Sequence, residues 1–221
     1  MTSFPNLRAL LLDVGGVLMD ERPSYRHFRR QACARLKGVS ARDMVAGQRA
    51  AIGANPRPRW ISQETIRRLG GDPEVAWGIW EEIDRRGLDR PYAEAPAALE
   101  RLGGRYRLAI LGNQGLQARG RLEAAGLLRF FEVVVISDEV GVSKPDPRIF
   151  ELALEQLGVA PCEAAMVGDR LDNDIGPAKR LGIIGIRMWR GPHVWQRPID
   201  ACERPDLTVR SLTALARVLN A

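Results

Sequence analysis

Histidine and cysteine are scarce in this sequence of 221 residues, which has 2 histidines and 3 cysteines. His27 and His193 are far apart in the chain and there is no Gly-x-Ser-x-Gly motif, so neither a Ser-His-Asp triad nor a histidine-rich metal site is expected. Cys33, Cys162 and Cys202 lack the spacing of zinc ligands, and their odd number does not suit a disulfide framework. This cysteine usage is typical of proteins in a reducing, cytoplasmic compartment.

Long hydrophobic runs are also absent, because no stretch approaches the roughly 20 apolar residues of a membrane span. The apolar run at Leu7–Leu12 ends at Asp13, and no small-residue cleavage pattern follows it. We therefore expect neither a membrane segment nor a secretion signal. The phosphate loop Gly-x-x-x-x-Gly-Lys-Ser/Thr is missing too, which argues against a P-loop nucleotide hydrolase.

Lysine is rare although the chain is basic, with 33 lysine and arginine residues, 27 acidic residues and a net charge of +6. The lysines are Lys37, Lys144 and Lys179, so the basic excess is mostly arginine, and it is spread along the whole chain. A compositional preference for arginine accounts for this charge, which bears on solubility more than on a binding site. We therefore expect no nucleic-acid partner.

The 45% of hydrophobic residues can form a sizeable core without disulfides or a structural metal. Residues from about 22 to 90 show helical spacing and no convincing strand, whereas short apolar runs alternate with helical segments after them. This alternation is typical of a parallel sheet covered on both faces, so we expect a three-layer α/β sandwich with a helical insert. The predicted strands are 8–13, 106–111, 133–136, 164–167, 183–188 and 207–209, and the predicted helices between them are 93–103, 116–125, 147–157, 174–181 and 211–219.

Polar residues follow the ends of the predicted strands. Residues 13–16 (Asp-Val-Gly-Gly) follow the first strand, residues 112–114 (Gly-Asn-Gln) the second, and Gly168 and Asp169 the fourth, while Lys144 lies in the loop after the third. Ligands bind at the carboxyl ends of the strands in an open parallel sheet, so we expect these residues to meet.

The residue types at these strand ends predict phosphoryl transfer. Carboxylate oxygens suit Mg²⁺, which also accepts water and phosphate oxygens as ligands. A lysine beside them can hold a phosphoryl oxygen, and backbone N–H groups at the turns can hold the others. An aspartate at a strand tip can attack phosphorus as a covalent nucleophile. Each piece alone has a simpler explanation; Asp146 and Pro147, for example, have the order of a helix N-cap and first helical residue.

Two stretches carry a resemblance to a known family: LLLDVGGVL near the N-terminus, and SKPDPRIFELALEQLGV followed by MVGDRLDNDIGPAKRLGI within Val142–Met188. The sequence resembles the haloacid dehalogenase-like (HAD) hydrolase superfamily over nearly its whole length, in the subfamily with a helical cap between the first two motifs. The resemblance implies a Rossmann-like core domain of residues 1–19 and 91–221. It also implies a cap domain of residues 20–90, which closes over the substrate and sets specificity.

The resemblance also implies roles for single residues. Asp13 would be the nucleophile, and Lys144 would bind phosphate and stabilise the phospho-aspartate. The implied Mg²⁺ ligands are Asp13, the backbone carbonyl of Gly15, Asp169 and Asp174, with Asn173 as a second possibility beside Asp174. The implied phosphate-binding residues are Gly16, Gly112, Asn113 and Lys144.

Two positions depart from the family's pattern. The phosphatases of the family usually carry a second aspartate two residues after the nucleophile, and this position is Gly15 here. A positioned acid/base is worth about 10²–10⁴ in rate, so its loss slows turnover, although glycine keeps the carbonyl that binds metal. The usual Ser/Thr of the second motif is Gly112, and the lost hydroxyl costs about 1.5–3 kcal/mol of phosphate binding.

We therefore expect a cytoplasmic Mg²⁺-dependent phosphatase, monomeric or homodimeric, that hydrolyses a small phosphorylated metabolite through an aspartyl-phosphate on Asp13. Two alternatives stay open. A 2-haloacid dehalogenase also lacks the second aspartate but works without metal, and a non-catalytic relative would only bind a phosphorylated ligand. The aromatic segment Trp189–Trp195 has no assigned role; it is interpreted as an edge cover or a dimer contact.

Overall fold

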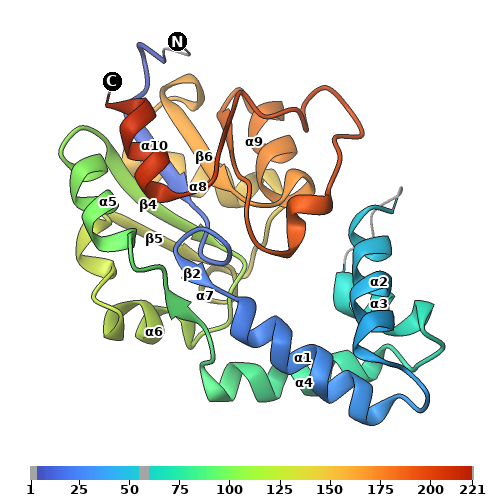
Figure 1. The fold of residues 1–221 in the computed structure, drawn as a ribbon. Helices are drawn as coiled ribbons and strands as arrows, with labels where there is room; N and C mark the ends of the chain where they lie inside the picture. Colours follow the sequence, from blue (N-terminus) through green and yellow to red (C-terminus); the bar gives the residue numbers. More distant parts are fainter. Residues whose placement is uncertain (1–3, 55–59, 221) are drawn as a thin grey trace. The chain divides into compact units, whose positions relative to one another are not determined.

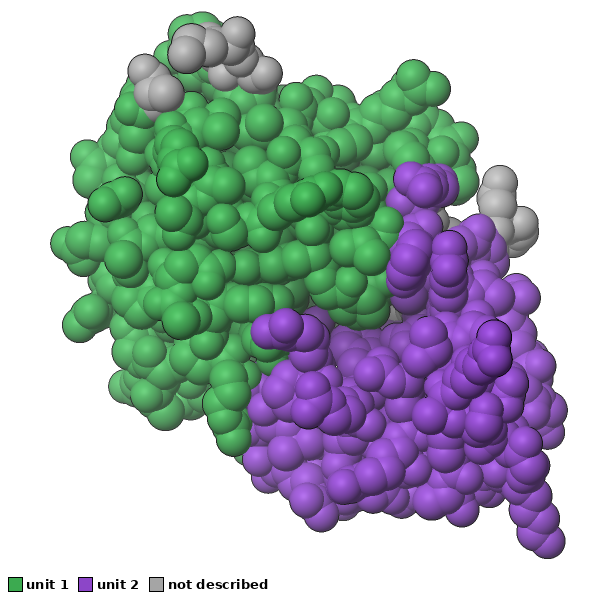
Figure 2. All heavy atoms as spheres, viewed as in Figure 1, with its two compact units in different colours: residues 1–20, 90–194, 198–221 green, residues 21–89, 195–197 purple. Residues whose placement is uncertain are grey.

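The computed structural model describes residues 4–54 and 60–220, so the predicted loop at Asn55–Arg59 lies outside the described residues. The chain forms two compact units (Figure 2). Unit 1 consists of residues 1–20, 90–194 and 198–221, and unit 2 of residues 21–89 and 195–197. Among the described residues, none of the helices has both the length and the apolar character needed to cross a bilayer.

Unit 1 is built on a 6-stranded parallel sheet of order β5-β4-β1-β6-β7-β8 (Figure 1). The prediction of a parallel α/β fold is confirmed, and each predicted strand is present with its ends shifted by no more than one residue. The central strand β1 pairs Leu11 with Ala109 of β4 on one side and with Met166 of β6 on the other. The strands are β1 (Ala9–Leu12), β4 (Arg107–Gly112), β5 (Val133–Ile136), β6 (Ala164–Gly168), β7 (Ile184–Met188) and β8 (Leu207–Val209).

Alternate side chains of β1 enter two different hydrophobic cores, because successive side chains of a strand point to opposite faces. Leu10 and Leu12 pack with apolar residues of α5 (Ala95–Gly103) and α10 (Leu212–Leu219). Ala9 and Leu11 pack with those of α8 (Pro147–Leu157) and α9 (Gly176–Arg180). Helices therefore cover both faces of the sheet. Each fully buried leucine stabilises the folded state by about 1.5–3 kcal/mol.

Short elements complete unit 1. Strands β2 (Met19–Asp20) and β3 (Arg90–Pro91) form an antiparallel pair where the chain leaves unit 1 and returns to it. Two residues are too few to show periodicity, so this pair was not predicted. The remaining short elements are α6 (Ala118–Ala124), η1 (Leu128–Phe130), α7 (Ser137–Val140), η2 (Pro161–Glu163), the π-helical turn η3 (Leu171–Ile175) and η4 (Pro192–Trp195), whose last residue is assigned to unit 2.

Unit 2 is helical, as the spacing of residues 22–90 predicts, with its own core around Phe28, Met44 and Ile79. Phe28 stacks on Trp80, with ring centroids 5.4 Å apart. Ser40 and Asp43 form a reciprocal capping box that satisfies the first amides of the second helix. The helices are α1 (Arg22–Arg35), α2 (Ala41–Ile52), α3 (Ile61–Arg68) and α4 (Glu74–Arg86).

Candidate active site

Two aspartates leave adjacent strands of the sheet at the same level. Asp13 directly follows β1 and Asp169 directly follows β6, and these strands pair in register up to Leu12 and Val167. The amide of Asp13 donates to the carbonyl oxygen of Val167 at 3.0 Å, which continues this pairing. The parallel sheet therefore brings the two carboxyl groups to one edge.

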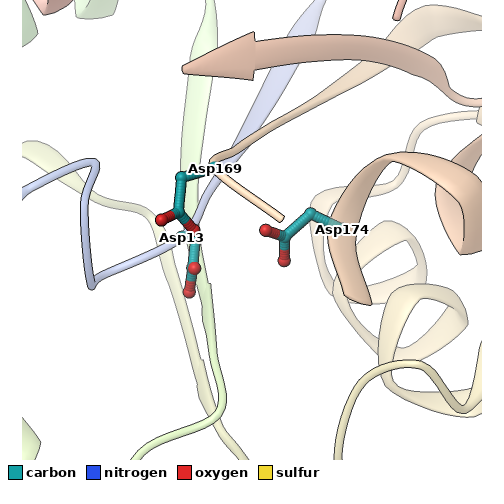
Figure 3. Close-up of side chains that lie close together, drawn as sticks. All are labelled: Asp13, Asp169 and Asp174. Carbon is teal, nitrogen blue, oxygen red and sulfur yellow. The ribbon is translucent and has the colours of Figure 1, made fainter. Parts of the chain in front are cut away.

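A third aspartate joins them from the turn after β6. Ligand oxygens of Asp13, Asp169 and Asp174 all lie within 4.8 Å of one another. In Figure 3 the carboxyl group of Asp174 points toward those of Asp13 and Asp169. Asp169 and Asp174 are buried, and the side chain of Asp13 is 13% exposed. Three carboxylates this close repel one another strongly where little water screens them, so the arrangement needs positive charge.

Lys144 supplies part of that charge from the loop between α7 and α8. Its Nζ lies 2.9 Å from Oδ1 of Asp13 and 2.7 Å from Oδ1 of Asp174. Burial alone would lower the pKa of the Lys144 ammonium, but the two carboxylates outweigh burial and raise its pKa. One ammonium against three carboxylates still leaves net negative charge at this site.

Asp174 is held in place by the backbone around it. Oδ2 of its carboxyl group accepts a hydrogen bond from the amide of Arg170 at 3.0 Å, while Oδ1 accepts from Lys144. Burial raises the pKa of Asp174 to about 6, and the ammonium of Lys144 opposes part of that rise. The π-helical turn Leu171–Ile175 places Asp174, and not Asn173, in this position.

Asn113 holds the backbone that carries Lys144. Its Nδ2 donates to the carbonyl oxygen of Lys144 and its Oδ1 accepts from the amide of Lys144, both at 2.8 Å. One side-chain amide thus satisfies both backbone polar groups of Lys144, its N–H and its carbonyl oxygen. The position of Asn113 beside the site was predicted, but this side-chain contact was not, because the strand-end pattern says nothing about long-range pairing.

Gly16, in the turn after Asp13, lets the backbone approach the carboxylate of Asp169. Gly16 has φ +65°, and a Cβ there would lie 2.7 Å from Oδ2 of Asp169. A side chain at this position is therefore disfavoured both by the backbone conformation and by contact with Asp169. The Gly16 amide donates to the carbonyl oxygen of Met19 at 3.0 Å, so its role as a phosphate ligand stays a prediction.

Gly112, at the end of β4, lies close to side-chain carbon atoms of Val14 and Gln114. A Cβ on Gly112 would lie 2.8 Å from Cγ2 of Val14 and 3.2 Å from Cγ of Gln114. Val14 is buried and β-branched, so its methyl group cannot easily move away. Any side chain at position 112, with or without a hydroxyl, would therefore meet Val14, the residue that follows Asp13.

The oxygen donors at this edge fit a hard divalent cation. Three carboxylates in mutual reach are the ligand type that Mg²⁺ prefers, and their excess negative charge is of the right sign. The carbonyl of Gly15 belongs to the same turn as Asp13 and Gly16. The roles of all these residues as ligands stay predictions.

The chain matches a family model described as haloacid dehalogenase-like hydrolase over residues 7–182. The chain belongs to this family. A phosphoserine phosphatase of Thermus thermophilus is 38% identical over 200 residues, which cover 88% of this chain and 78% of the relative. A glyceraldehyde 3-phosphate phosphatase of Methanopyrus kandleri is 36% identical over 150 residues, which cover 65% of this chain and 64% of the relative.

A solved structure shows the same likeness in three dimensions. The crystal structure of a HAD phosphatase from Thermococcus onnurineus matches with a TM-score of 0.63 and 26% identity, over 96% of this chain and 98% of that one. The hydrolase family predicted from the two motifs is thus confirmed, and relatives of this HAD-like hydrolase are named phosphatases.

The close packing of Gly168 against Asp174 yields a first prediction for this HAD-like hydrolase. A Cβ on Gly168 would overlap the Cβ and carboxyl group of Asp174. Gly168→Ala is therefore expected to displace Asp174 and to lower the free energy of unfolding by about 1–3 kcal/mol, measured by urea denaturation. The control is Gly120→Ala, since a Cβ on Gly120 meets nothing within 4 Å. Equal stability of Gly168→Ala and wild type would contradict this packing.

The coupling between Gly112 and Val14 yields a second prediction. Gly112→Ser, which restores the family's usual hydroxyl, is expected to destabilise the protein because its Cβ meets Val14. Val14→Ala makes room, so the double variant should be more stable than the two single effects predict, by about 0.5–3 kcal/mol. Gly103→Ser is the control partner for Val14→Ala, because a Cβ on Gly103 is 3.7 Å from its nearest neighbour, Cδ1 of Leu108. Strict additivity for Gly112 and Val14 would show that they do not interact.

Proposed function

We propose that this chain is a Mg²⁺-dependent phosphatase that hydrolyses a small phosphomonoester through an aspartyl-phosphate on Asp13. The observation that supports it most is the cluster of Asp13, Asp169 and Asp174 with Lys144 between two of the carboxylates. The phosphatase names of the relatives point in the same direction. The substrates in those names, phosphoserine and glyceraldehyde 3-phosphate, are both small phosphomonoesters, and this supports the proposed substrate class.

In the proposed reaction a carboxylate oxygen of Asp13 attacks the phosphorus atom. The new P–O bond to Asp13 forms while the ester P–O bond breaks, and the leaving oxygen takes the electron pair and a proton. A water molecule then attacks the phosphorus, the P–O bond to Asp13 breaks, and inorganic phosphate leaves. The carboxylate of Asp13 is regenerated, so the net reaction is hydrolysis.

Lys144 has two tasks in this scheme. Its ammonium fixes the carboxyl group of Asp13 through the contact at 2.9 Å, which orients the nucleophile before substrate binds. It also offsets the negative charge that a phosphoryl group brings to a site already lined by carboxylates. The raised pKa of Lys144 keeps it positive at neutral pH for both tasks.

Mg²⁺ would be held by four groups: the carboxylates of Asp13, Asp169 and Asp174, and the carbonyl of Gly15. When bound, the cation neutralises the carboxylates and stabilises the charge of the transferring phosphoryl group. Because position 15 is glycine, no side chain there donates a proton to the leaving oxygen. The proton then comes from water or from a hydroxyl group of the substrate, so we expect slower turnover than an aspartate at this position would allow.

We propose that the insertion of residues 21–89, which makes up most of unit 2, acts as the cap that selects the substrate. It is a helical insertion with its own hydrophobic core, and β2 and β3 carry the chain out to it and back. Such an insertion can change its helices without disturbing the sheet that positions the aspartates. The predictions of a cytoplasmic location and of a monomer or homodimer are kept.

Phosphate release from p-nitrophenyl phosphate, with and without Mg²⁺, tests this function. We expect activity that requires Mg²⁺, is abolished by Asp13→Asn and is kept by Asp138→Asn, whose carboxylate is exposed and lies outside the cluster. The trapped intermediate should add the mass of one phosphoryl group to the peptide that contains Asp13. Halide release from a 2-haloacid without metal would select a dehalogenase, and inactivity on a broad phosphate-ester panel would select a non-catalytic binding protein.

Addition of Mg²⁺ to the metal-free protein yields a further prediction. A ligand that binds only the folded state stabilises it by about 2.7 kcal/mol at 100 times its dissociation constant, so the melting temperature should rise with Mg²⁺ until the site saturates. Asp169→Asn should remove most of this rise, because it removes one of three clustered carboxylates. Asp138→Asn should keep it. A rise of equal size in both variants would place Mg²⁺ elsewhere.

A further inference from the structure

The turn that follows Asp13 is closed by its own backbone. The carbonyl oxygen of Val14 accepts from the amides of Leu18 and Met19, both at 2.9 Å, and the Gly16 amide donates to Met19 at 3.0 Å. This pattern forms a bridge between Gly15 and Met19 that uses neither polar backbone group of Gly15. Among the described residues, none donates a hydrogen bond to the Gly15 carbonyl.

The next two carbonyls of this turn are held by one distant side chain, that of Arg190. Its Nε donates to the carbonyl oxygen of Gly16 at 2.8 Å, and its Nη2 donates to that of Val17. Arg190 lies in the loop after β7, 174 residues away from Gly16 in the sequence. It belongs to the aromatic segment Trp189–Trp195, for which the sequence suggests no catalytic role.

The guanidinium of Arg190 is itself fixed on its other sides. Nη1 lies 2.6 Å from Oε1 of Glu94, and the guanidinium carbon lies 3.3 Å from the ring centroid of Tyr92. The Arg190 side chain is 14% exposed, so few of its contacts are shared with water. The Tyr92 amide also donates to Leu18 at 3.0 Å, so the residues that hold Arg190 are joined to the same turn. A planar group with donors in a fixed fork suits such a role better than a flexible ammonium.

The residue after Arg190 also lies close to the carboxylate of Asp169. Gly191 has φ +74°, and a Cβ there would lie 3.7 Å from Oδ2 of Asp169. Gly16 approaches the same oxygen, with a Cβ position 2.7 Å away. Arg190 thus joins two stretches of backbone that both lie beside Asp169.

We propose that Arg190 is a positioning residue of this site, which holds the turn after Asp13 so that the carbonyl of Gly15 stays available to a cation. It acts through the carbonyls of Gly16 and Val17 and touches neither substrate nor metal. Glycine at position 15 has no side chain that could anchor the turn, so its conformation depends on contacts made by its neighbours. The cation-binding part of this inference rests on the proposed function, whereas the hold on the turn does not.

Arg190→Met removes the guanidinium and keeps an apolar stem against Tyr92. Arg190→Lys keeps a positive charge but loses the paired N–H donors of the guanidinium. Glu94→Gln removes the negative charge that pairs with Arg190 and leaves the guanidinium itself unchanged. The matched control is Arg210→Met, because the guanidinium of Arg210 also stacks on an aromatic ring, that of Trp189 at 4.5 Å. Within the described part of the chain, Arg210 makes no hydrogen bond to residues 14–19. Each variant is measured in the whole protein by amide hydrogen exchange of residues 14–19, by calorimetric titration with Mg²⁺, and by kcat and KM for p-nitrophenyl phosphate.

We expect Arg190→Met to speed amide exchange in the turn, to weaken Mg²⁺ binding and to lower kcat, each of the last two by about 10–100-fold, with little change in KM. Arg190→Lys and Glu94→Gln should fall between this variant and wild type. Arg210→Met should match wild type in all three measurements. If Arg190→Met does not fold, the same order is expected of Arg190→Lys and Glu94→Gln against the control.

Unchanged exchange in the turn, together with Mg²⁺ affinity equal to that of Arg210→Met, would overturn the assignment of Arg190. A fall in thermal stability with no change in exchange or Mg²⁺ binding would also overturn it, because Arg190 would then be only structural. If the wild-type protein neither binds Mg²⁺ nor releases phosphate, the proposed function fails. The exchange measurement in metal-free protein still decides in that case whether Arg190 holds the turn.

Discussion

Like charges at one edge of a parallel sheet are the constraint on which this structure depends. Asp13, Asp169 and Asp174 bring carboxyl oxygens within 4.8 Å of one another, and two of these residues are fully or almost fully buried. Lys144 answers part of the repulsion by contacting Asp13 and Asp174 at once. The raised pKa of Asp174 shows that burial and crowding still outweigh this single positive charge. Further positive charge would stabilise the three carboxylates, and a divalent cation is a ligand that can supply it.

Backbone contacts hold these charged groups in place. The side-chain amide of Asn113 pairs with the backbone N–H and carbonyl of Lys144, and the backbone amide of Arg170 donates a hydrogen bond to Asp174. Gly16 and Gly168 let the main chain pass where a methyl group would strike a carboxylate. Contacts of this kind are short-ranged and directional, so small displacements of the surrounding turns would change the distances between the charges. Repelling groups stay together only when the structure around them leaves no alternative position.

The sheet was predictable because each buried strand is a short, continuous apolar run, and the residues after each run were thereby predicted to lie at one edge. Asp146 was recognised as a helix N-cap for a similarly local reason, and its side chain accepts from the amide of Arg148 at 2.9 Å. The resemblance named Asp174 ahead of Asn173, and the structure places Asp174 beside the other two aspartates. The π-helical turn that does so was not predicted, because the apolar pattern of the sequence does not distinguish it from an α-helical turn. Arg190 could not be found either, since its contacts join parts of the chain 174 residues apart.

The two glycines that depart from the family's pattern affect different steps of the proposed reaction. Gly112 removes a hydroxyl that would hold phosphate, whereas Gly15 removes the group that would protonate the leaving oxygen. The charged groups of the site are all present, namely Lys144 and the three aspartates. Loss of a proton donor matters least for an ester whose leaving group is a weak base, and most for an alkyl ester. Activity on an aryl phosphate therefore reports on Asp13 and the cation, while the ratio of aryl to alkyl ester hydrolysis reports on where the missing proton comes from.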